Sequence, residues 1–354
     1  MNLLPLIENR ALAGAVTLIA DRDEILHLEA SGYADLAAQQ PMAPDTLFWI
    51  ASVTKPITAT ALMMLVDEGK VGLDDPVERY LPEFKDRWVL AEETADRRVL
   101  QRAVQPLQVR HLLSNTSGLP FRSPLETPTL DLYPLSLGVG GYGMLPLQSE
   151  PGSRYGYSNA GFNSAGRIIE VVSGLSYEAF LAERLFVPLG MRETTFRPNR
   201  EQLSRLARSY RPNPETQALE AMQIDQLFHP LDDPRRQPMP AGGLFSTAAD
   251  VAAFAQMILQ KGVRHGRRYL SAAAVEAMTV KQTAPEIVDA YGFGWGIDET
   301  GFGHGGAYKN NFHIDPQAGR IAILMVQQAG EWGTEEGKTI FPALCREAAA
   351  WPKG

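Results

Sequence analysis

The chain has 354 residues, of which 45% are hydrophobic and 21% charged, as in a globular protein with a buried core. Its formal net charge is −8, without long runs of one sign, which argues against a nucleic-acid partner because such a partner requires a basic face. Cys345 is the only cysteine, so an intramolecular disulfide is excluded, and the six histidines lack metal-binding spacing. We therefore expect no metal and no other cofactor.

The beginning of the chain predicts neither a membrane span nor a secretory signal. The longest apolar stretch, 11–20, is too short to cross a bilayer. The first ten residues lack a basic start and contain Pro5 and Glu8. We expect a cytoplasmic protein, or a periplasmic one if the chain is a processed mature form, and the sequence leaves the oligomeric state open.

Predicted strands lie near both ends of the chain, and predicted helices lie between them. The expected strands are 15–20, 24–30, 291–298, 303–308, 311–315 and 321–327. The expected helices are 52–68, 109–114, 158–173, 177–185, 251–260, 271–278 and 338–350. Two stretches rich in Pro and Gly, 118–157 and 229–243, are expected to be loops. This order predicts a sheet built from both termini and a helical insert.

The first candidate site is Ser52-Val-Thr-Lys55-Pro56, at the start of a predicted helix. Residues three apart share a helix face, so the Lys55 amine would lie near the Ser52 hydroxyl. A lysine can accept a serine proton if burial lowers its pKa. Pro56 is compatible only with the first helical turn, which places Ser52 at the N-terminus. By itself this spacing is more typical of a helix N-cap serine followed by a surface lysine.

The second candidate site is Tyr155-Gly-Tyr157-Ser158-Asn159. A tyrosine beside a lysine can pass a proton to a leaving group, and an asparagine side chain both donates to and accepts from an amide or ester. The alternative is a loop rich in Tyr and Gly that is capped at the next helix. A second Tyr-x-Asn, at Tyr308 and Asn310, is interpreted as coincidental.

The third candidate site is Gly303-His304-Gly305-Gly306-Ala307. Its glycines would let a substrate approach the backbone, and the N–H of Ala307 could bind an oxyanion. His304 could bind a substrate carboxylate or support the tyrosine. The alternative is a glycine-rich turn with a solvated histidine. The segment 138–143 matches a dinucleotide-binding spacing, but it follows no predicted strand and precedes no predicted helix.

Together and in this order, the three motifs resemble the signatures of the serine β-lactamase and penicillin-binding-protein superfamily. The branch is that of class C β-lactamases, family VIII carboxylesterases and D-stereospecific peptidases. The flanking segments 109–119, 242–250 and 291–296 agree with it, and the resemblance extends from about residue 12 to the end. It implies an α+β fold, with an antiparallel sheet flanked by helices and an inserted all-α lobe. We expect 1–70 and 245–354 to form the α/β lobe and 71–244 a mainly helical lobe, with the active site between them.

The resemblance also implies residue roles. Ser52 would be the acylated nucleophile and Lys55 its proton acceptor, helped by Tyr157. Asn159 would orient the acyl side chain, and the N–H groups of Ser52 and Ala307 would form the oxyanion hole. His304, Gly305 and Gly306 would complete the substrate-binding edge.

One position departs from the β-lactamase pattern, which usually has Lys-Thr-Gly at the third motif. His304 replaces that permanent cation, and a histidine is mostly neutral at pH 7. A neutral ring binds a substrate carboxylate weakly, so we expect a carboxylesterase that cleaves small uncharged esters. A β-lactamase, a D-amino-acid peptidase or D,D-carboxypeptidase, and a non-catalytic ligand-binding member of the fold are the alternatives. Apolar residues of the 118–157 stretch could line an acyl pocket or pack on the helical lobe; these are Phe121, Tyr133, Leu135, Tyr142 and Met144.

Overall fold

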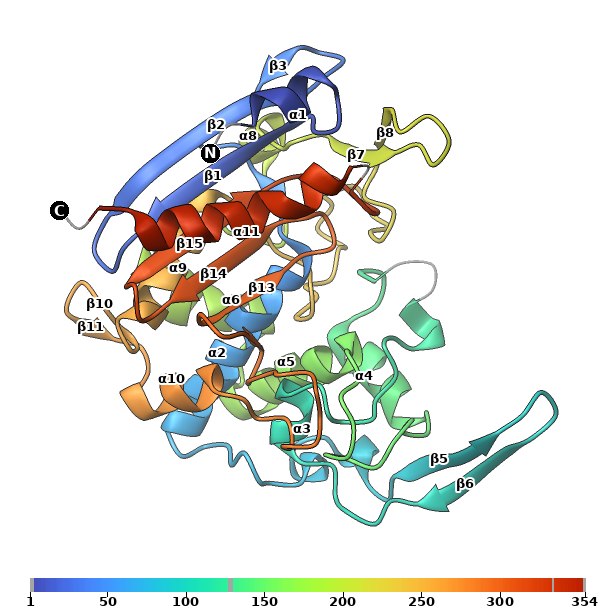
Figure 1. Ribbon diagram of the computed structural model, residues 1–354. Coiled ribbons are helices and arrows are strands. Elements are labelled where there is room, and N and C mark those ends of the chain that lie inside the picture. Colours follow the sequence, from blue (N-terminus) through green and yellow to red (C-terminus); the bar gives the residue numbers. More distant parts are fainter. Residues whose placement is uncertain (1–2, 127–129, 333, 353–354) are drawn as a thin grey trace.

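Strands from the two ends of the chain form one sheet, as their sequence patterns predict (Figure 1). The computed structural model describes residues 3–126, 130–332 and 334–352. Its largest sheet has seven strands in the order β12-β13-β14-β15-β1-β2-β3, and all neighbouring strands are antiparallel. The strands are β1 (Gly14–Ala20), β2 (Ile25–Asp35), β3 (Gln40–Pro41), β12 (Gly296–Ile297), β13 (Phe302–Gly305), β14 (Asn311–Asp315) and β15 (Arg320–Met325).

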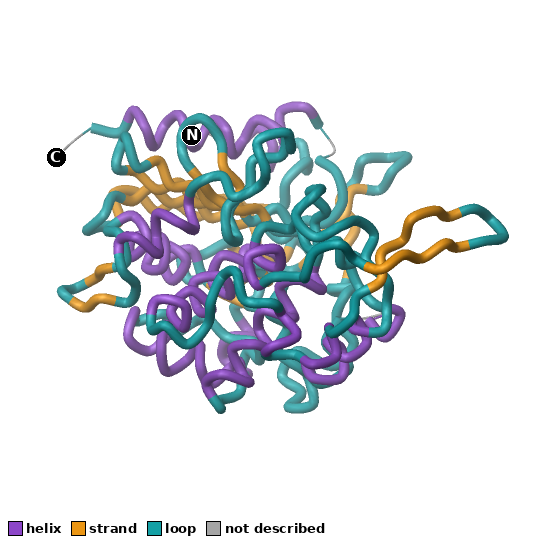
Figure 2. The backbone as a smooth tube through the Cα atoms, turned by 90° about the horizontal axis from the view of Figure 1, so that it is seen from below, coloured by secondary structure: helices purple, strands orange, loops and turns teal. Residues whose placement is uncertain are grey.

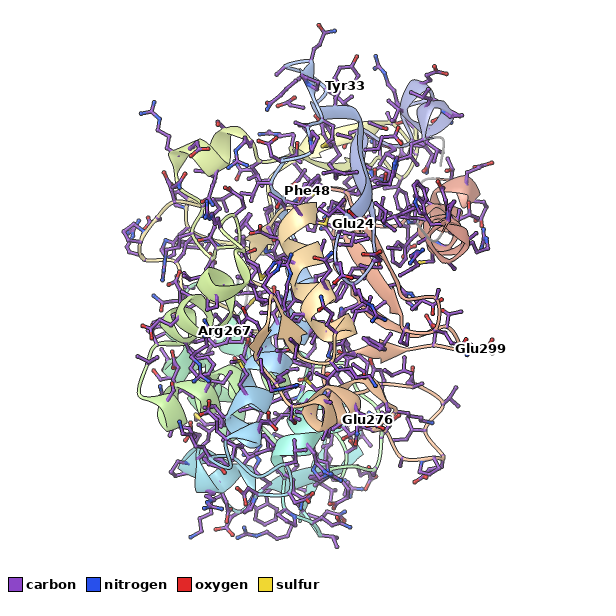
Figure 3. The ribbon with its side chains drawn as sticks, turned by 90° about the vertical axis from the view of Figure 1, so that its left-hand side faces the viewer. Glu24, Tyr33, Phe48, Arg267, Glu276 and Glu299 are labelled. Atoms are coloured by element: carbon purple, nitrogen blue, oxygen red, sulfur yellow. The ribbon has the colours of Figure 1, made fainter. Side chains whose placement is uncertain are left out.

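Helices cover both faces of this sheet. Seen from the side in Figure 3, α9 (Ala248–Leu259) and α11 (Glu335–Ala350) lie on opposite sides of it. All seven residues of β1 are buried. Val16 belongs to the main core, which includes α9, whereas Ile19 packs with Leu344 of α11. Because successive strand residues point to opposite faces, this continuous apolar strand needs cover on both sides.

The helix α2 (Thr54–Asp67) passes through the centre of the molecule. Every residue in 54–65 is buried, and the helix packs against α5 (Asn159–Ser173). Lys55 is the only charged side chain in that buried run. The other helices are α1 (Leu4–Glu8), α3 (Val109–Leu113), α4 (Leu135–Gly143), α6 (Tyr177–Leu181), α7 (Val187–Leu189), α8 (Arg200–Ser204) and α10 (Ala272–Thr279). Within the described residues, no helix is both long and apolar enough to cross a membrane.

The structure confirms the predicted α+β class with a large antiparallel sheet and flanking helices. It adds short hairpins that the sequence patterns did not predict. They are β5–β6 (Trp88–Glu93 and Arg98–Arg102), β7–β8 (Ser209–Pro212 and Leu219–Met222) and β10–β11 (Val263–Arg264 and Arg267–Arg268). The β5–β6 hairpin projects from the body of the molecule (Figures 1 and 2). Most of its residues are exposed and many are charged, so the sequence lacks the alternation of apolar and polar residues that predicts a strand. The division into lobes at 70/71 and 244/245 stays a prediction.

Two sequence expectations are wrong in detail. The segment 118–157 is not only a loop, because it contains the helix α4, in which Val139 and Tyr142 are buried. The glycines of the segment 138–143, which matches a dinucleotide-binding spacing, lie inside this helix. Glycine has a poor helix propensity, so the sequence pattern did not predict a helix here. The expected strand 291–298 is reduced to β12, because Phe293 and Trp295 are buried in the core without strand pairing.

A buried ion pair between Asp131 and Arg236 joins the segments 118–157 and 229–243. The Asp131 and Arg236 side chains are only 1% and 2% exposed, and their Oδ2 and Nε atoms are 2.8 Å apart. The guanidinium also donates to the carbonyl of Phe196, and Asp131 accepts from the backbone N–H of Phe228. Each charge is therefore compensated by the other and by backbone groups.

We expect Asp131→Ala to lower the free energy of unfolding by about 3–5 kcal/mol, because it leaves a buried guanidinium without its counter-charge. Urea denaturation measures this change. Glu92→Ala is the matched control, because it breaks the exposed pair between Glu92 and Arg97 and should cost about 1 kcal/mol or less. Equal losses in the two variants would contradict the prediction.

Candidate active site

Ser52 lies where a short strand turns into the central helix. The strand β4 (Phe48–Trp49) pairs with β9 (Phe245–Ser246), and a 3-10 turn (Ala51–Val53) leads directly into α2. Ala51 has φ 45°, a left-handed conformation that is uncommon for a residue with a side chain. Its carbonyl accepts from the Thr54 hydroxyl at 2.7 Å, which holds the turn. The α-helix thus begins two residues after Ser52, and the nucleophile candidate stands at its entrance.

The Lys55 amine is fully buried and has three hydrogen-bond partners. Its Nζ lies 3.0 Å from Ser52 Oγ, 2.8 Å from Asn159 Oδ1 and 2.7 Å from the carbonyl oxygen of Ala241. None of these three partners is a carboxylate. Burial lowers the pKa of Lys55 well below its ordinary value, because the ammonium is poorly solvated there.

This arrangement suits a neutral amine that accepts a proton. A neutral amine has two hydrogens and one lone pair. The oxygens of Asn159 and Ala241 can only accept, so they take both hydrogens of Lys55. Ser52 Oγ, 3.0 Å from Nζ, accepts a third hydrogen when the amine is protonated and can donate to its lone pair when the amine is neutral. The geometry therefore presents a base to the serine hydroxyl.

Tyr157 lies beside the same two residues. The Lys55 nitrogen is 4.6 Å from the centroid of the Tyr157 ring. Burial raises the pKa of Tyr157 above its ordinary value, and a hydrogen bond with Ser52 acts less strongly in the opposite direction. The phenol is thus protonated at neutral pH. Such a group can donate a proton to a departing oxygen.

Asn115 fixes the loop that carries Tyr157. Its carbonyl accepts from the N–H of Gly156 at 2.8 Å, and its Oδ1 accepts from the N–H of Ser158 at 3.0 Å. Ser158 in turn caps α5 by accepting from the N–H of Gly161. Asn159 is the first residue of that helix, so its side chain is directed by the cap.

The third motif approaches Ser52 through a tight turn after β13. The Gly306 N–H donates to the carbonyl of Asn310 at 2.7 Å. A Cβ atom on Gly306 would lie 2.5 Å from the Ile50 carbonyl oxygen, so only glycine allows this approach. Ser52 and Ala307 line the same cavity of about 490 Å³. In the described part of the chain, neither backbone N–H has an acceptor, so both are available to an oxyanion.

His304 is neutral and already engaged at both ring nitrogens. Its Nδ1 lies 2.7 Å from the carbonyl oxygen of Gly305, so this nitrogen carries the proton. Its Nε2 then accepts from the Tyr291 hydroxyl at 2.9 Å. Burial and the nearby charge of Lys55 lower the pKa of His304 to about 3. The ring supplies neither a positive charge nor a spare donor to a substrate carboxylate.

Several residues that hold the site were not found from the sequence. The Ala241 N–H donates to Asn163 Oδ1 at 3.0 Å, which positions the peptide whose carbonyl binds Lys55. Asn163 also donates to the buried Glu126 carboxylate at 3.1 Å and to the Tyr142 hydroxyl at 2.8 Å. A backbone acceptor such as Ala241 has no side-chain signature. Asn163 follows Asn159 by one helical turn, and this spacing was the available signal.

Asn310, whose match to the second motif was interpreted as coincidental, has a structural role in the site. Asn310 is fully buried, and its Nδ2 donates to the Trp49 carbonyl at 3.0 Å. Its own carbonyl accepts from Gly306. This residue therefore ties the strand before Ser52 to the turn before Ala307. Tyr308 packs edge-on against Trp49 beside it.

The cavity next to Ser52 and Ala307, here called the first cavity, has a mixed lining. Of the apolar residues proposed from the 118–157 stretch, only Phe121 lines it. Tyr142 is engaged in the Glu126 network, and Met144 is 87% exposed. The described residues contain no group of three His, Cys, Asp or Glu side chains placed to hold a metal ion.

Most of the chain matches a known protein family. The family model described as Beta-lactamase matches residues 3–341. The chain belongs to the Beta-lactamase family. It is thus a member of a serine hydrolase family, and the resemblance stated from its motifs is confirmed.

Relatives within the Beta-lactamase family include both penicillin-binding proteins and esterases. Penicillin-binding protein 4 of Amycolatopsis lactamdurans is 31% identical, over 97% of this chain and 87% of its own. Esterase EstB of Burkholderia gladioli is 37% identical, over 54% of this chain and 48% of its own. The structure of EstCE1, described as a hydrolase with promiscuous acyltransferase activity, superposes with a TM-score of 0.78 at 25% identity and covers 98% of this chain and 96% of that one.

We expect Gly306→Ala to lower kcat/KM for an ester by about 10²-fold or more, because the added Cβ pushes Ala307 N–H out of position. Steady-state kinetics measures this loss, and thermal unfolding shows whether the variant still folds. Gly138→Ala is the control, because a Cβ there meets no atom within 4 Å. Full activity of a folded Gly306→Ala variant would contradict the assignment of an oxyanion hole.

Proposed function

We propose that this protein is a serine esterase that hydrolyses small carboxylic esters through an acyl-enzyme intermediate. The observation that carries the proposal is the buried Lys55 amine, whose two hydrogens are taken by fixed acceptors and whose third partner is Ser52 Oγ. This arrangement generates a serine nucleophile without histidine or metal as the base.

In the acylation step, Lys55 Nζ takes the proton of Ser52, and Oγ attacks the ester carbonyl carbon. The carbonyl oxygen becomes an oxyanion held by the N–H groups of Ser52 and Ala307. The C–O bond to the alcohol then breaks. The leaving oxygen takes the Tyr157 phenolic proton, and Tyr157 recovers a proton from the Lys55 ammonium.

In the deacylation step, a water molecule replaces the alcohol and loses its proton to the same pair of groups. Its oxygen attacks the acyl carbon, and a second tetrahedral oxyanion forms in the same place. Collapse releases the carboxylic acid and returns the proton to Ser52. Each group ends in its starting protonation state, so the cycle balances. Asn159 would orient the acyl side chain in the first cavity.

The neutral His304 favours esters over substrates that carry a carboxylate at this edge. The similarity to EstB and EstCE1 also supports hydrolysis of esters. The second candidate function is hydrolysis of β-lactams or D-amino-acid peptides, and the 31% identity with penicillin-binding protein 4 over nearly the whole chain favours it. A non-catalytic binding role is disfavoured by the intact contact between Lys55 and Ser52.

Replacing Ser52 tests the function directly. We expect Ser52→Ala to lower kcat/KM for p-nitrophenyl acetate by about 10³-fold or more, because the nucleophile is lost. A fluorophosphonate probe should label the Ser52 peptide of the wild-type protein, as mass spectrometry detects. Ser153→Ala, an exposed serine outside the site, is the control.

Two outcomes would count against the esterase proposal. Unchanged ester hydrolysis in Ser52→Ala would exclude the mechanism. A wild-type kcat/KM several orders higher for nitrocefin or a D-alanyl-D-alanine peptide than for simple esters would favour the second candidate function.

The pH profile tests the role of Lys55. The active form has a neutral amine, so kcat/KM should rise with pH as the ammonium deprotonates. Burial lowers the pKa of Lys55, so this rise should be complete well below pH 10.5. With a pKa of about 3, His304 contributes no step between pH 5 and 8.

Lys55→Arg should be inactive at every pH, because a guanidinium keeps its proton. Lys70→Arg, at an exposed lysine, is the control, and an active Lys55→Arg would exclude Lys55 as the base.

A further inference from the structure

Tyr157 separates two cavities. The first cavity contains Ser52 and Ala307. The second cavity, of about 440 Å³, is lined by Tyr155, Tyr291, His304 and Asp289, among others. Tyr157 and Gly305 line both.

On the proposed esterase function, the two cavities receive different parts of the substrate. The carbonyl oxygen must point to the N–H groups of Ser52 and Ala307, in the first cavity. The leaving oxygen must reach the proton of Tyr157, at the boundary. The alcohol beyond that oxygen therefore extends into the second cavity.

The second cavity has a negative charge without a counter-charge. Asp289 is exposed, and among the described residues its carboxylate has no hydrogen bond or ion pair. Asp298 also lines the cavity but is paired with His313 at 3.2 Å. No lysine or arginine of the described chain lines this cavity. An anionic alcohol would be repelled here, and a cationic one attracted.

Aromatic residues line the same cavity. Tyr155 and Tyr291 have ring centroids 5.7 Å apart and planes tilted by 52°, so they form an angled aromatic wall. Tyr157 adds a third ring. Burial, and to a lesser degree the Asp289 charge, raise the pKa of Tyr155 to about 12, so this phenol stays neutral at pH 7. Aromatic faces combined with a carboxylate are the groups that bind quaternary ammonium ions.

We propose that the second cavity is a subsite for a cationic alcohol, in which Asp289 and the wall formed by Tyr155, Tyr157 and Tyr291 bind a quaternary ammonium group. The preferred substrates are then esters of amino alcohols, and esters of alcohols that carry a carboxylate are disfavoured. This inference rests on the proposed esterase function and names its substrate class.

The test compares acetylcholine with its neutral isostere 3,3-dimethylbutyl acetate, which differ in the charge of the leaving alcohol. The measured quantity is the ratio of kcat/KM for the two esters. Each rate is measured by pH-stat titration of the acid released. We expect Asp289→Asn to lower this ratio by about 3- to 10-fold, as for an exposed charge close to the ligand. Tyr155→Leu, which keeps an apolar side chain but removes the aromatic face, should lower it as well. Added salt should reduce the ratio of the wild type toward that of Asp289→Asn.

Asp96→Asn, in the β5–β6 hairpin, changes the net charge equally and should leave the ratio unchanged. A ratio that is the same in wild type, Asp289→Asn and Tyr155→Leu would overturn the subsite. So would a wild-type preference for 4-acetoxybutanoate, whose alcohol is anionic, over acetylcholine. If Ser52→Ala hydrolysed these esters as fast as the wild type, the esterase function itself would fall, and the subsite proposal with it.

Discussion

The site depends on one amine that is buried without a counter-charge from any described residue. Lys55 belongs to a helix whose first three turns are wholly enclosed, and its nitrogen has only neutral oxygen partners. Burying an ammonium in such surroundings is unfavourable, so the protein stabilises the neutral amine instead. The core packing that encloses α2 therefore also favours the unprotonated form of Lys55, the form that can accept a proton from a hydroxyl.

The same core brings together segments that are distant along the chain. The carbonyl of Ala241, the side chain of Asn159 and the turn at Gly306 all reach the first turn of α2 from different directions. Asn310 couples two of these elements, because it binds the Trp49 carbonyl through its side chain and Gly306 through its backbone. A shift of the β13 turn would thus also move the approach to Ser52. The proposed nucleophile and the proposed oxyanion donors are thus positioned as one unit.

The sequence allowed the sheet and the motifs to be predicted, because both depend on short-range patterns. Alternating or continuous apolar runs mark strands, and the three-residue spacing of Ser52 and Lys55 marks one helix face. Contacts such as that between Lys55 and the Ala241 carbonyl could not be predicted, because any residue type supplies a backbone carbonyl. The strand expected at 291–298 failed for a related reason. Phe293 and Trp295 are apolar because they fill the core, and burial alone does not distinguish a strand from a packed loop.

Permanent charges lie at the edges of the two cavities, whereas the reacting groups are uncharged at rest. On the proposed mechanism, the Ser52 hydroxyl, the Lys55 amine, the Tyr157 phenol and the His304 imidazole are all neutral in the form that begins the reaction. Charge first appears as a pair, when the oxyanion and the Lys55 ammonium form together in an enclosed space, where their attraction is strong.

Arg122 lines the first cavity and Asp289 the second, and both are exposed. Solvent screens these two charges from the reacting atoms, but a substrate group that enters either cavity lies close to them. They therefore act on binding more than on the chemical step. On the proposed function, a change at either position would alter which ester is bound without rebuilding the proposed catalytic groups.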